Sequence, residues 1–224
     1  MPNALPAFAS SALFGPALGL ALLATPALAD DGFRPLTAFH SYATGAPPPP
    51  NWRIEGDTIM HTPGGGDIVS NESFADFELD FDWKISPGGN SGVMYRVIEN
   101  PKAAPSDSGL EYQILDNHGH SDGKDPLTSA ASAYAIYAPS RDMTKPVGDW
   151  NSARIIARGN HVEHWLNGVQ VLSYELGSPD WKRRVAASKF AHTPTYGASP
   201  KGGIDLQDHG FPVSYRNMRI KVLE

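Results

Sequence analysis

One segment of the chain alternates apolar and charged side chains over nine residues, and this alternation restricts the fold more than any other feature. Between residues 77 and 85 the odd positions are Phe, Leu, Phe, Trp and Ile, and the even positions are Glu, Asp, Asp and Lys. Successive side chains of a β-strand point to opposite faces of a sheet. The segment therefore predicts a strand with one face in a core and the other in water.

Further segments predict strands separated by turn residues: 93–98, 110–115, 153–158, 161–166, 170–174, 203–207 and 213–223. Gly159-Asn160 and Asn167-Gly168 lie between alternating runs, and they suit tight hairpins because Gly and Asn tolerate a positive φ. No helical period persists through a long segment, although residues 178–187 are compatible with a short turn. The pattern predicts an all-β protein, built as a sandwich or jelly roll.

The composition indicates a single domain. With 224 residues and 41% hydrophobic residues, the chain can bury one core. Residues 30–50 end in four prolines, which cannot pair as a central strand, so we expect an extended N-terminal segment followed by a β-sandwich over residues 51–224. The net charge of −6 comes from interspersed acids and bases, without a basic stripe, which argues against nucleic acid as a partner.

The N-terminal residues predict an export signal. Residues 1–29 contain no charged side chain, include an apolar run over residues 17–24, and end in Ala27-Leu28-Ala29. This is typical of a secretory signal with its cleavage site, although the usual Lys or Arg near the start is missing. The alternative is a short membrane anchor, but the apolar run is too short to span a bilayer. Because the chain has no cysteine, neither disulfides nor a lipid-modified cysteine are expected, and we predict a soluble protein of the bacterial periplasm, away from the membrane after cleavage.

Several motifs are more specific than a generic sheet. They are residues 76–79 (Asp-Phe-Glu-Leu), 88–96 (Gly-Gly-Asn-Ser-Gly-Val-Met-Tyr-Arg), 109–117 (Gly-Leu-Glu-Tyr-Gln-Ile-Leu-Asp-Asn), 146–151, 161–168, 203–210 and 215–217. Their order and content resemble the 3-keto-disaccharide hydrolase family, formerly a domain of unknown function, over about residues 32–222. The resemblance implies a concanavalin A-like jelly-roll β-sandwich. Residues 36–50 and 129–134 depart from the family pattern, which bears on loop shape and substrate choice rather than on the fold.

The resemblance also implies a reaction. A sugar with a ketone at C3 has an acidified C2 proton, so a base can remove that proton and the glycosidic oxygen can leave from C1. Hydration afterwards gives net hydrolysis of the 3-keto-glycoside or 3-keto-disaccharide. Such chemistry requires a base, a donor for the enolate oxygen and an acid for the leaving group. An oxidoreductase that makes the keto-sugar is implied as well.

Two other functions remain open at this point. A sandwich of this kind also serves carbohydrate-binding modules that have no catalytic activity, since a fold does not dictate a function. A conventional, glucanase-like glycoside hydrolase is the second alternative, and it requires a pair of carboxylates that face one cleft. The strand predicted at 110–115 supplies only one of them. No feature of the sequence assigns an oligomeric state.

The first candidates for the site lie on predicted strands. Glu111 and Gln113 share a face of one strand, and Arg96 on another strand is expected to meet them. The alternative is a surface salt bridge of little energetic weight. With the resemblance, we assign Glu111 as base and His209 as acid. Arg96, Gln113, Gln207 and Arg216 then position the substrate or stabilise the enolate, and Asn90, Trp150 and Tyr134 are further substrate-binding candidates.

The sequence requires no cofactor, but a group of metal-ligating residue types occurs within residues 116–125. Asp116, His118 and His120 are weak candidates for a divalent metal, and Asp122 and Asp125 follow them. Their spacing matches neither an EF-hand loop nor a zinc helix, and Asp and His are also common in turns.

A second His and Glu set lies at residues 161–164. On a strand, His161 and His164 point to opposite faces, so the segment predicts one arm of a hairpin rather than a zinc site. The chain also lacks the Gly-x-Ser-x-Gly elbow of serine hydrolases.

Overall fold

The computed structural model describes Met1 and residues 31–224. The predicted signal segment therefore lies, apart from Met1, outside the described residues. Residues 32–224 form one unit, which holds all the strands given below. Within the described residues, no helix is long and apolar enough to cross a membrane.

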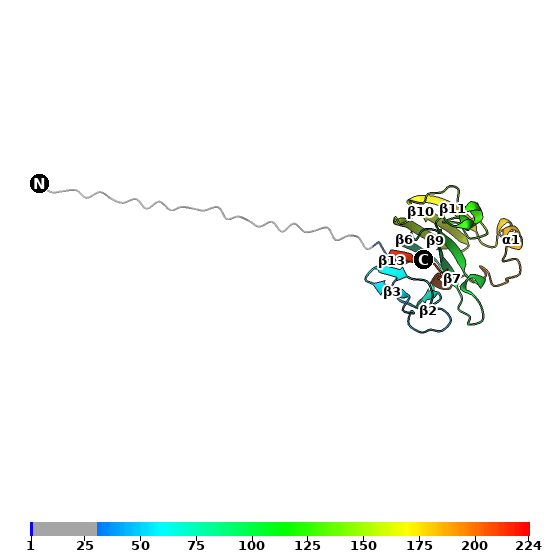
Figure 1. Cartoon of the computed structure of the whole chain (residues 1–224), viewed down its shortest axis with the longest axis horizontal. Coiled ribbons are helices and arrows are strands. Elements are labelled where there is room, and N and C mark those ends of the chain that lie inside the picture. The colour runs from blue at the N-terminus through cyan, green and yellow to red at the C-terminus, as the bar shows by residue number, and fades with distance from the viewer. Residues whose placement is uncertain (2–30) are drawn as a thin grey trace. The chain divides into compact units, whose positions relative to one another are not determined.

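Among the described residues, the strands form two antiparallel sheets (Figure 1). The eight-stranded sheet has the order β11 (Val169–Glu175), β10 (His161–Leu166), β9 (Asn151–Arg158), β6 (Phe77–Ile85), β13 (Val213–Val222), β4 (Thr58–His61) and β3 (Trp52–Glu55), with β1 (Arg34–Pro35) paired to β13. The five-stranded sheet has the order β2 (Phe39–Ser41), β5 (Ile68–Ser70), β12 (Gly203–Leu206), β7 (Asn90–Val97) and β8 (Leu110–Leu115). The expected all-β sandwich is confirmed.

The core lies between the two sheets. Every odd position of β6 is buried, as its alternation predicts. The ring of Phe81 on β6 meets the ring of Tyr112 on β8 edge to face, with centroids 5.7 Å apart. Tyr112 therefore points toward the eight-stranded sheet, and Leu110 and Ile114 share its parity. Glu111 and Gln113 have the opposite parity and lie on the outer face of the five-stranded sheet.

Short helices and turns connect the strands. The 3₁₀ helices are η1 (Pro105–Asp107), η2 (Ser121–Lys124) and η3 (Pro126–Thr128). An α-helix, α1 (Pro179–Ala186), occupies the segment where we expected a short turn, and it lies at the periphery of the sandwich (Figure 1). The Ser178 side chain accepts a hydrogen bond from Trp181 N at 3.1 Å, and Pro179 takes the first helical position. Both are preferred ways to begin a helix.

The sandwich begins earlier than the sequence pattern suggested. β1 and β2 precede the four prolines, and each pairs with a strand of a different sheet. These strands have two and three residues, too few to display an alternation that sequence patterns can detect. The prolines themselves contribute no strand, as expected.

Candidate functional site

The outer face of the five-stranded sheet gathers polar side chains from three adjacent strands. Across these strands, Glu111 pairs with Met94 and Met94 pairs with Asp205, so all three side chains share one face. Two positions further along, Gln113 pairs with Gly92, and Gln207 N donates to Gly92 O at 3.1 Å. We call the resulting set the polar face: Asn90, Glu111, Gln113, Asp205 and Gln207.

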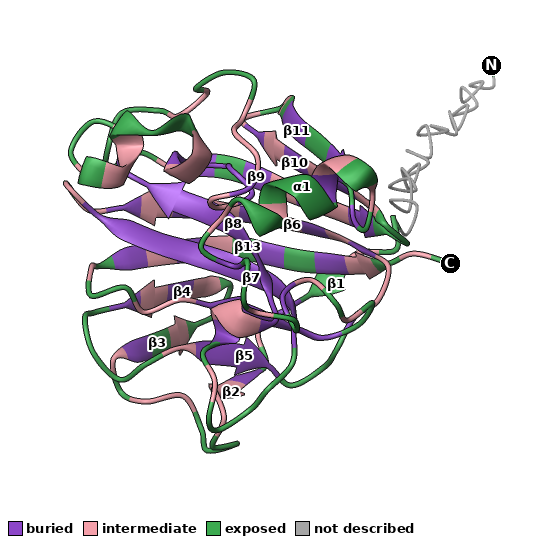
Figure 2. Cartoon of the chain, turned by 90° about the vertical axis from the view of Figure 1, so that its right-hand side faces the viewer, coloured by how far each residue is buried: buried purple, intermediate pink, exposed green. Residues whose placement is uncertain are grey.

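The polar face is covered rather than open to solvent along its strands. β7 and β8 are buried over their whole length, as Figure 2 shows. A sheet face that is both polar and buried is uncommon, because each buried polar group loses its hydrogen bonds to water and needs other partners in their place. The polar face is therefore the candidate functional site.

Glu111 is the most unusual group of the polar face. Glu111 is only 6% exposed, and its carboxylate accepts no hydrogen bond from the described residues. Burial raises the pKa of Glu111 to about 7; the positive charge of Lys189 opposes this, and the negative charges of Asp67 and Asp122 add to it. A carboxyl group of this kind exchanges its proton near neutral pH, as a general base does.

Tyr134 and Lys189 lie beside Glu111. Tyr134 N donates to the backbone oxygen of Glu111 at 3.2 Å, and the Lys189 ammonium lies 4.2 Å from the centre of the Tyr134 ring. Burial raises the pKa of Tyr134 to about 12, and the charges of Asp122 and Glu111 add to the rise. The Tyr134 hydroxyl is therefore a proton donor at neutral pH, and Lys189 adds a cation to a surface that is otherwise acidic.

Three other members of the polar face carry buried oxygen atoms that accept no hydrogen bond from the described residues. These atoms are Asn90 Oδ1, Gln207 Oε1 and both carboxyl oxygens of Asp205. Burial raises the pKa of Asp205 far above its usual range, and the charges of Asp67 and Glu111 raise it further. Burial without a partner therefore favours the protonated form of the Asp205 carboxyl group, because an unpaired charge at this depth is costly.

Gln113 has a different role from its neighbours. Its side-chain nitrogen donates to Thr128 O at 3.3 Å, and its side-chain oxygen accepts from Ile114 N at 3.2 Å. Ala131 N also donates to the backbone oxygen of Gln113 at 2.8 Å. Gln113 therefore holds the segment that follows η3, which carries Tyr134.

The prediction that Arg96 meets Glu111 and Gln113 is wrong. Arg96 has a positive φ of 56°, and its guanidinium donates to Ala75 O at 2.9 Å and to Gly159 O at 2.9 Å. Asp76 lies 3.5 Å away. The regular alternation expected for this strand breaks at Arg96, and the side chain ties two turns together instead.

Arg216 and Trp150 lie on the other side of the sandwich. Arg216 Nε donates to Asp82 at 3.0 Å, and its guanidinium carbon lies 4.2 Å from the centre of the Trp150 ring. Asp82 occupies an even, outward position of β6. Both candidates therefore belong to the outer face of the eight-stranded sheet, and the core separates them from Glu111.

His209 lies on the loop that follows β12. Its ring is exposed and stacks on Phe211 with centroids 6.5 Å apart. The adjacent Asp208 anchors the loop, because its carboxylate accepts from Gly66 N and Gly210 N, each at 3.0 Å. β12 ends at Leu206, so Gln207 and His209 both lie on the segment that follows this strand.

The weak metal candidates do not converge. The Asp116 carboxylate accepts hydrogen bonds from the backbone nitrogens of Gly88, His118 and Gly119, which hold its pKa low against the effect of partial burial. His120 Nδ1 accepts from Asp122 N at 3.1 Å and so caps η2. Within residues 31–224, no group of three or more His, Asp or Glu side chains has the geometry to hold a metal ion.

The second His and Glu set follows the sequence interpretation. The His161 ring contacts Glu175 and Glu163 at the surface, at 2.6 and 3.1 Å. The His164 ring points into the core, where it contacts the Tyr95 hydroxyl at 2.9 Å and the backbone oxygen of Ala131 at 3.0 Å. Burial lowers the pKa of His164 to about 4, so this ring is a neutral core group.

Sequence reasoning missed three ionisable groups on or near the polar face: Asp67, Asp205 and Lys189. Parity alone would have found Asp205, because it lies two residues before Gln207 on a predicted strand. Asp67 precedes β5, a strand too short to predict, and Lys189 follows α1. No local pattern in the sequence indicates that these two reach Glu111.

A family model described as a 3-keto-alpha-glucoside-1,2-lyase-like domain matches residues 29–221. A Bacteroides thetaiotaomicron protein named 3-keto-disaccharide hydrolase is 35% identical over 207 residues, which cover 79% of this chain and 71% of the relative.

Two solved structures are similar to this chain. A Parabacteroides distasonis protein, provisionally described as a glycosyl hydrolase, superimposes with a TM-score of 0.80 at 34% identity, covering 86% of this chain and 94% of that one. A second protein of that organism with the same description gives a TM-score of 0.67 at 27% identity, covering 85% and 99%. The chain therefore belongs to the 3-keto-disaccharide hydrolase family, the family of 3-keto-alpha-glucoside-1,2-lyase-like domains.

Proposed function

We propose that this protein cleaves glycosides whose sugar carries a ketone at C3, with Glu111 as the base that removes the C2 proton. The observation that carries the proposal is the buried Glu111 carboxyl, whose pKa of about 7 lets it accept a proton near neutral pH. The name of the curated relative supports glycoside cleavage in general.

The groups around Glu111 suit the charges that develop in this reaction. Loss of the C2 proton places negative charge on the C3 oxygen, and preorganised donors stabilise such an enolate. We assign this role to the Lys189 ammonium, whose charge acts on Glu111, and to the Tyr134 hydroxyl, whose ring lies against Lys189. His209, exposed on the loop after β12, is proposed to protonate the leaving oxygen.

The remaining members of the polar face support the site. Asn90 and Gln207 offer buried amide oxygens for the sugar or for the side chains that contact it. Gln113 positions the Tyr134 segment through its bond to Thr128. We further propose that the reaction takes place in the bacterial periplasm, because the apolar run and the Ala-Leu-Ala site precede the folded domain.

The experiment compares oxidised and unoxidised sugars. Purified mature protein is mixed with 3-keto-trehalose, and separately with trehalose, and glucose release is followed with and without a chelator. Release from the keto-sugar only is expected, and a chelator effect would reveal a metal requirement. In D₂O, deuterium at C2 of the product supports elimination and hydration, whereas its absence at full turnover contradicts the C2 mechanism.

A conventional two-carboxylate hydrolase is a second candidate, favoured by the position of Asp205. Asp205 and Glu111 are separated by the single strand β7, so their backbones lie about 10 Å apart. Inverting glycosidases hold a protonated and an ionised carboxyl about 6.5–9.5 Å apart, each on its own side of the bond. Cleavage of trehalose at the rate of 3-keto-trehalose would favour this candidate over the first.

A further inference from the structure

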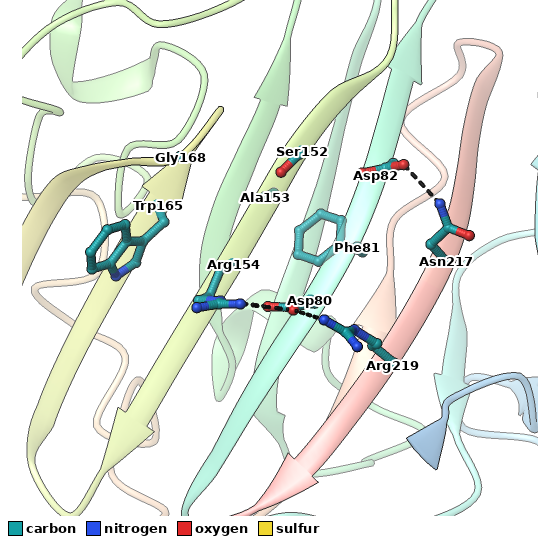
Figure 3. Close-up of a pocket in the computed structure, with 10 residues that line it drawn as sticks. All are labelled: Asp80, Phe81, Asp82, Ser152, Ala153, Arg154, Trp165, Gly168, Asn217 and Arg219. Atoms are coloured by element: carbon teal, nitrogen blue, oxygen red, sulfur yellow. Dashed lines mark hydrogen bonds and ion pairs between the residues drawn. The ribbon is translucent and has the colours of Figure 1, made fainter. Parts of the chain in front are cut away.

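A hollow of about 580 Å³ lies on the outer face of the eight-stranded sheet (Figure 3). The volume is in the range of sites that bind small molecules. Its lining includes Trp165, Arg154, Asp80, Arg219 and Asn217. Because β6 turns its odd residues toward the core and its even residues outward, this hollow and Glu111 lie on opposite outer faces of the sandwich.

A row of side chains crosses the floor of the hollow. Trp165 pairs with Arg154 across β10 and β9, Arg154 pairs with Asp80 on β6, and Asp80 pairs with Arg219 on β13. Arg154 binds Asp80 with two hydrogen bonds, of 2.6 and 2.9 Å, and Arg219 donates to Asp80 at 3.0 Å. The row is fixed before any ligand arrives, and its charges are largely balanced.

Trp165 forms one wall of the hollow. The ring is half-buried, and its Nε1 donates to Glu163 at 2.7 Å, which fixes the orientation of the indole. Gly168 lines the hollow beside it, and a β-carbon at that glycine would meet no atom within 4 Å. The indole is thus a rigid, partly exposed apolar plate at the edge of a polar floor.

A β-bulge on β13 brings the Asn217 side chain to the floor of the hollow. The register of β13 shifts between Arg216 and Arg219, and Asn217 adopts a positive φ of 52°. Bulges of this kind turn consecutive side chains to one face. As a result both Arg216 and Asn217 reach Asp82, whose Oδ2 accepts from each of them at 3.0 Å.

The upper part of the floor keeps hydrogen-bonding capacity. Within residues 31–224, the Ser152 hydroxyl, the Asp82 Oδ1 and the Asn217 Oδ1 take part in no described hydrogen bond, and all three residues line the hollow. Figure 3 shows them together above the Arg154–Asp80 pair. Acceptors and a hydroxyl of this kind match the vicinal hydroxyl groups of a sugar.

We propose that this hollow is a second carbohydrate-binding site, which holds a neutral gluco-oligosaccharide with one pyranose ring stacked on Trp165. A glucose ring presents axial C–H groups to an indole, while its equatorial hydroxyls point outward toward polar partners. Because the aspartates on the floor are paired with arginines, the hollow favours a neutral ligand over a charged one. Because the site lies away from Glu111, it holds a longer glycan without taking part in the cleavage.

The test measures oligosaccharide binding by isothermal titration calorimetry. The probes are cellohexaose, laminarihexaose and maltohexaose, each titrated into wild-type protein and into Trp165→Ala, Asn217→Gly and Glu55→Gln. Asn217→Gly removes the side-chain amide, and glycine adopts the positive φ of this position without strain. This variant therefore still tests the site if Trp165→Ala fails to fold. Glu55→Gln is a control on β3 of the same sheet, outside the hollow.

At least one probe is expected to bind the wild type. Its affinity should fall about tenfold in Trp165→Ala and about threefold in Asn217→Gly, and stay unchanged in Glu55→Gln. Turnover of 3-keto-trehalose should be unaffected by all three changes, which separates this site from the proposed catalytic one. Absence of binding by all three probes, or equal affinity in wild type and both hollow variants, overturns the proposal.

Discussion

The Glu111 carboxyl group occupies the space that a side chain at Gly92 would need. A β-carbon placed on Gly92 would lie 3.0 Å from Glu111 Cδ and closer still to Oε1. Gly92 has no positive φ, so its lack of a side chain serves this contact rather than a turn. The glycine on β7 thus sets where the carboxyl group on β8 lies.

Gly92→Ala should displace the Glu111 carboxyl and lower kcat/KM for a 3-keto-glycoside at least about tenfold, since catalysis is sensitive to small misplacements. Crowding should also cost about 1–3 kcal/mol of stability. The stability cost should be smaller in a Glu111→Ala background, where the space is vacated. An equal cost in both backgrounds, measured by urea unfolding, would show that the contact is not responsible.

Lys189→Gln should raise the pKa of Glu111, because the Lys189 charge opposes the rise caused by burial. The acid limb of the kcat/KM profile should therefore move to higher pH. Lys189→Arg keeps the charge and should retain the wild-type profile more closely. Lys182→Gln changes an exposed lysine on α1 and serves as the control. Identical acid limbs in Lys189→Gln and wild type would remove Lys189 from the site.

Glu111 should make the protein less stable as pH rises. Its pKa in the folded protein is about 7, above the ordinary value of 4.5, so the folded state holds the proton longer than the unfolded chain. The free energy of unfolding should fall by roughly 3 kcal/mol between pH 4.5 and 7 from this group alone. Glu111→Gln should gain stability relative to wild type over that window and no more above it. Parallel pH profiles of the two proteins, measured by denaturant unfolding, would contradict the raised pKa.

Arg96→Met should damage stability and leave substrate binding intact. The substitution deprives Ala75 O and Gly159 O of their donor, at a cost of about 3 kcal/mol in the free energy of unfolding. KM for 3-keto-trehalose should stay within about twofold of wild type, because Arg96 does not face the polar face. Arg53→Met, at an exposed position, is the control. A raised KM at unchanged stability would return Arg96 to the site.

Much of the fold is predictable from the sequence because long strands repeat their alternation often enough to be detected. β6, β8 and β10 have the predicted bounds, Phe77–Ile85, Leu110–Leu115 and His161–Leu166. The strands of two to four residues before residue 71 carry too few alternating positions, so they were missed. Their pairing depends on distant partners, such as β13 for β1.

The site was predictable only where parity decides it. Glu111 and Gln113 share a face because they are two residues apart on one strand, as expected. The prediction for Arg96 was wrong because its positive φ interrupts the alternation of the strand. The residue type gives no indication of such a break. The positions of Arg216 and Trp150 could not be predicted, because the sequence does not show which of the two sheets contains each strand. Lys189 reaches Glu111 through a loop, where neither alternation nor spacing applies.

The most direct test of the central claim is the pH dependence of kcat/KM on 3-keto-trehalose for wild-type protein and Glu111→Gln, with Glu55→Gln as the exposed control. If Glu111 is the base, the wild-type rate should rise tenfold per pH unit and level off near pH 7, where its carboxyl group ionises. Glu111→Gln should lose about 10²–10⁴-fold in activity and the acid limb with it, while retaining the fold. Glu111→Gln activity within about tenfold of wild type, with the same acid limb, would contradict the assignment of Glu111 as base.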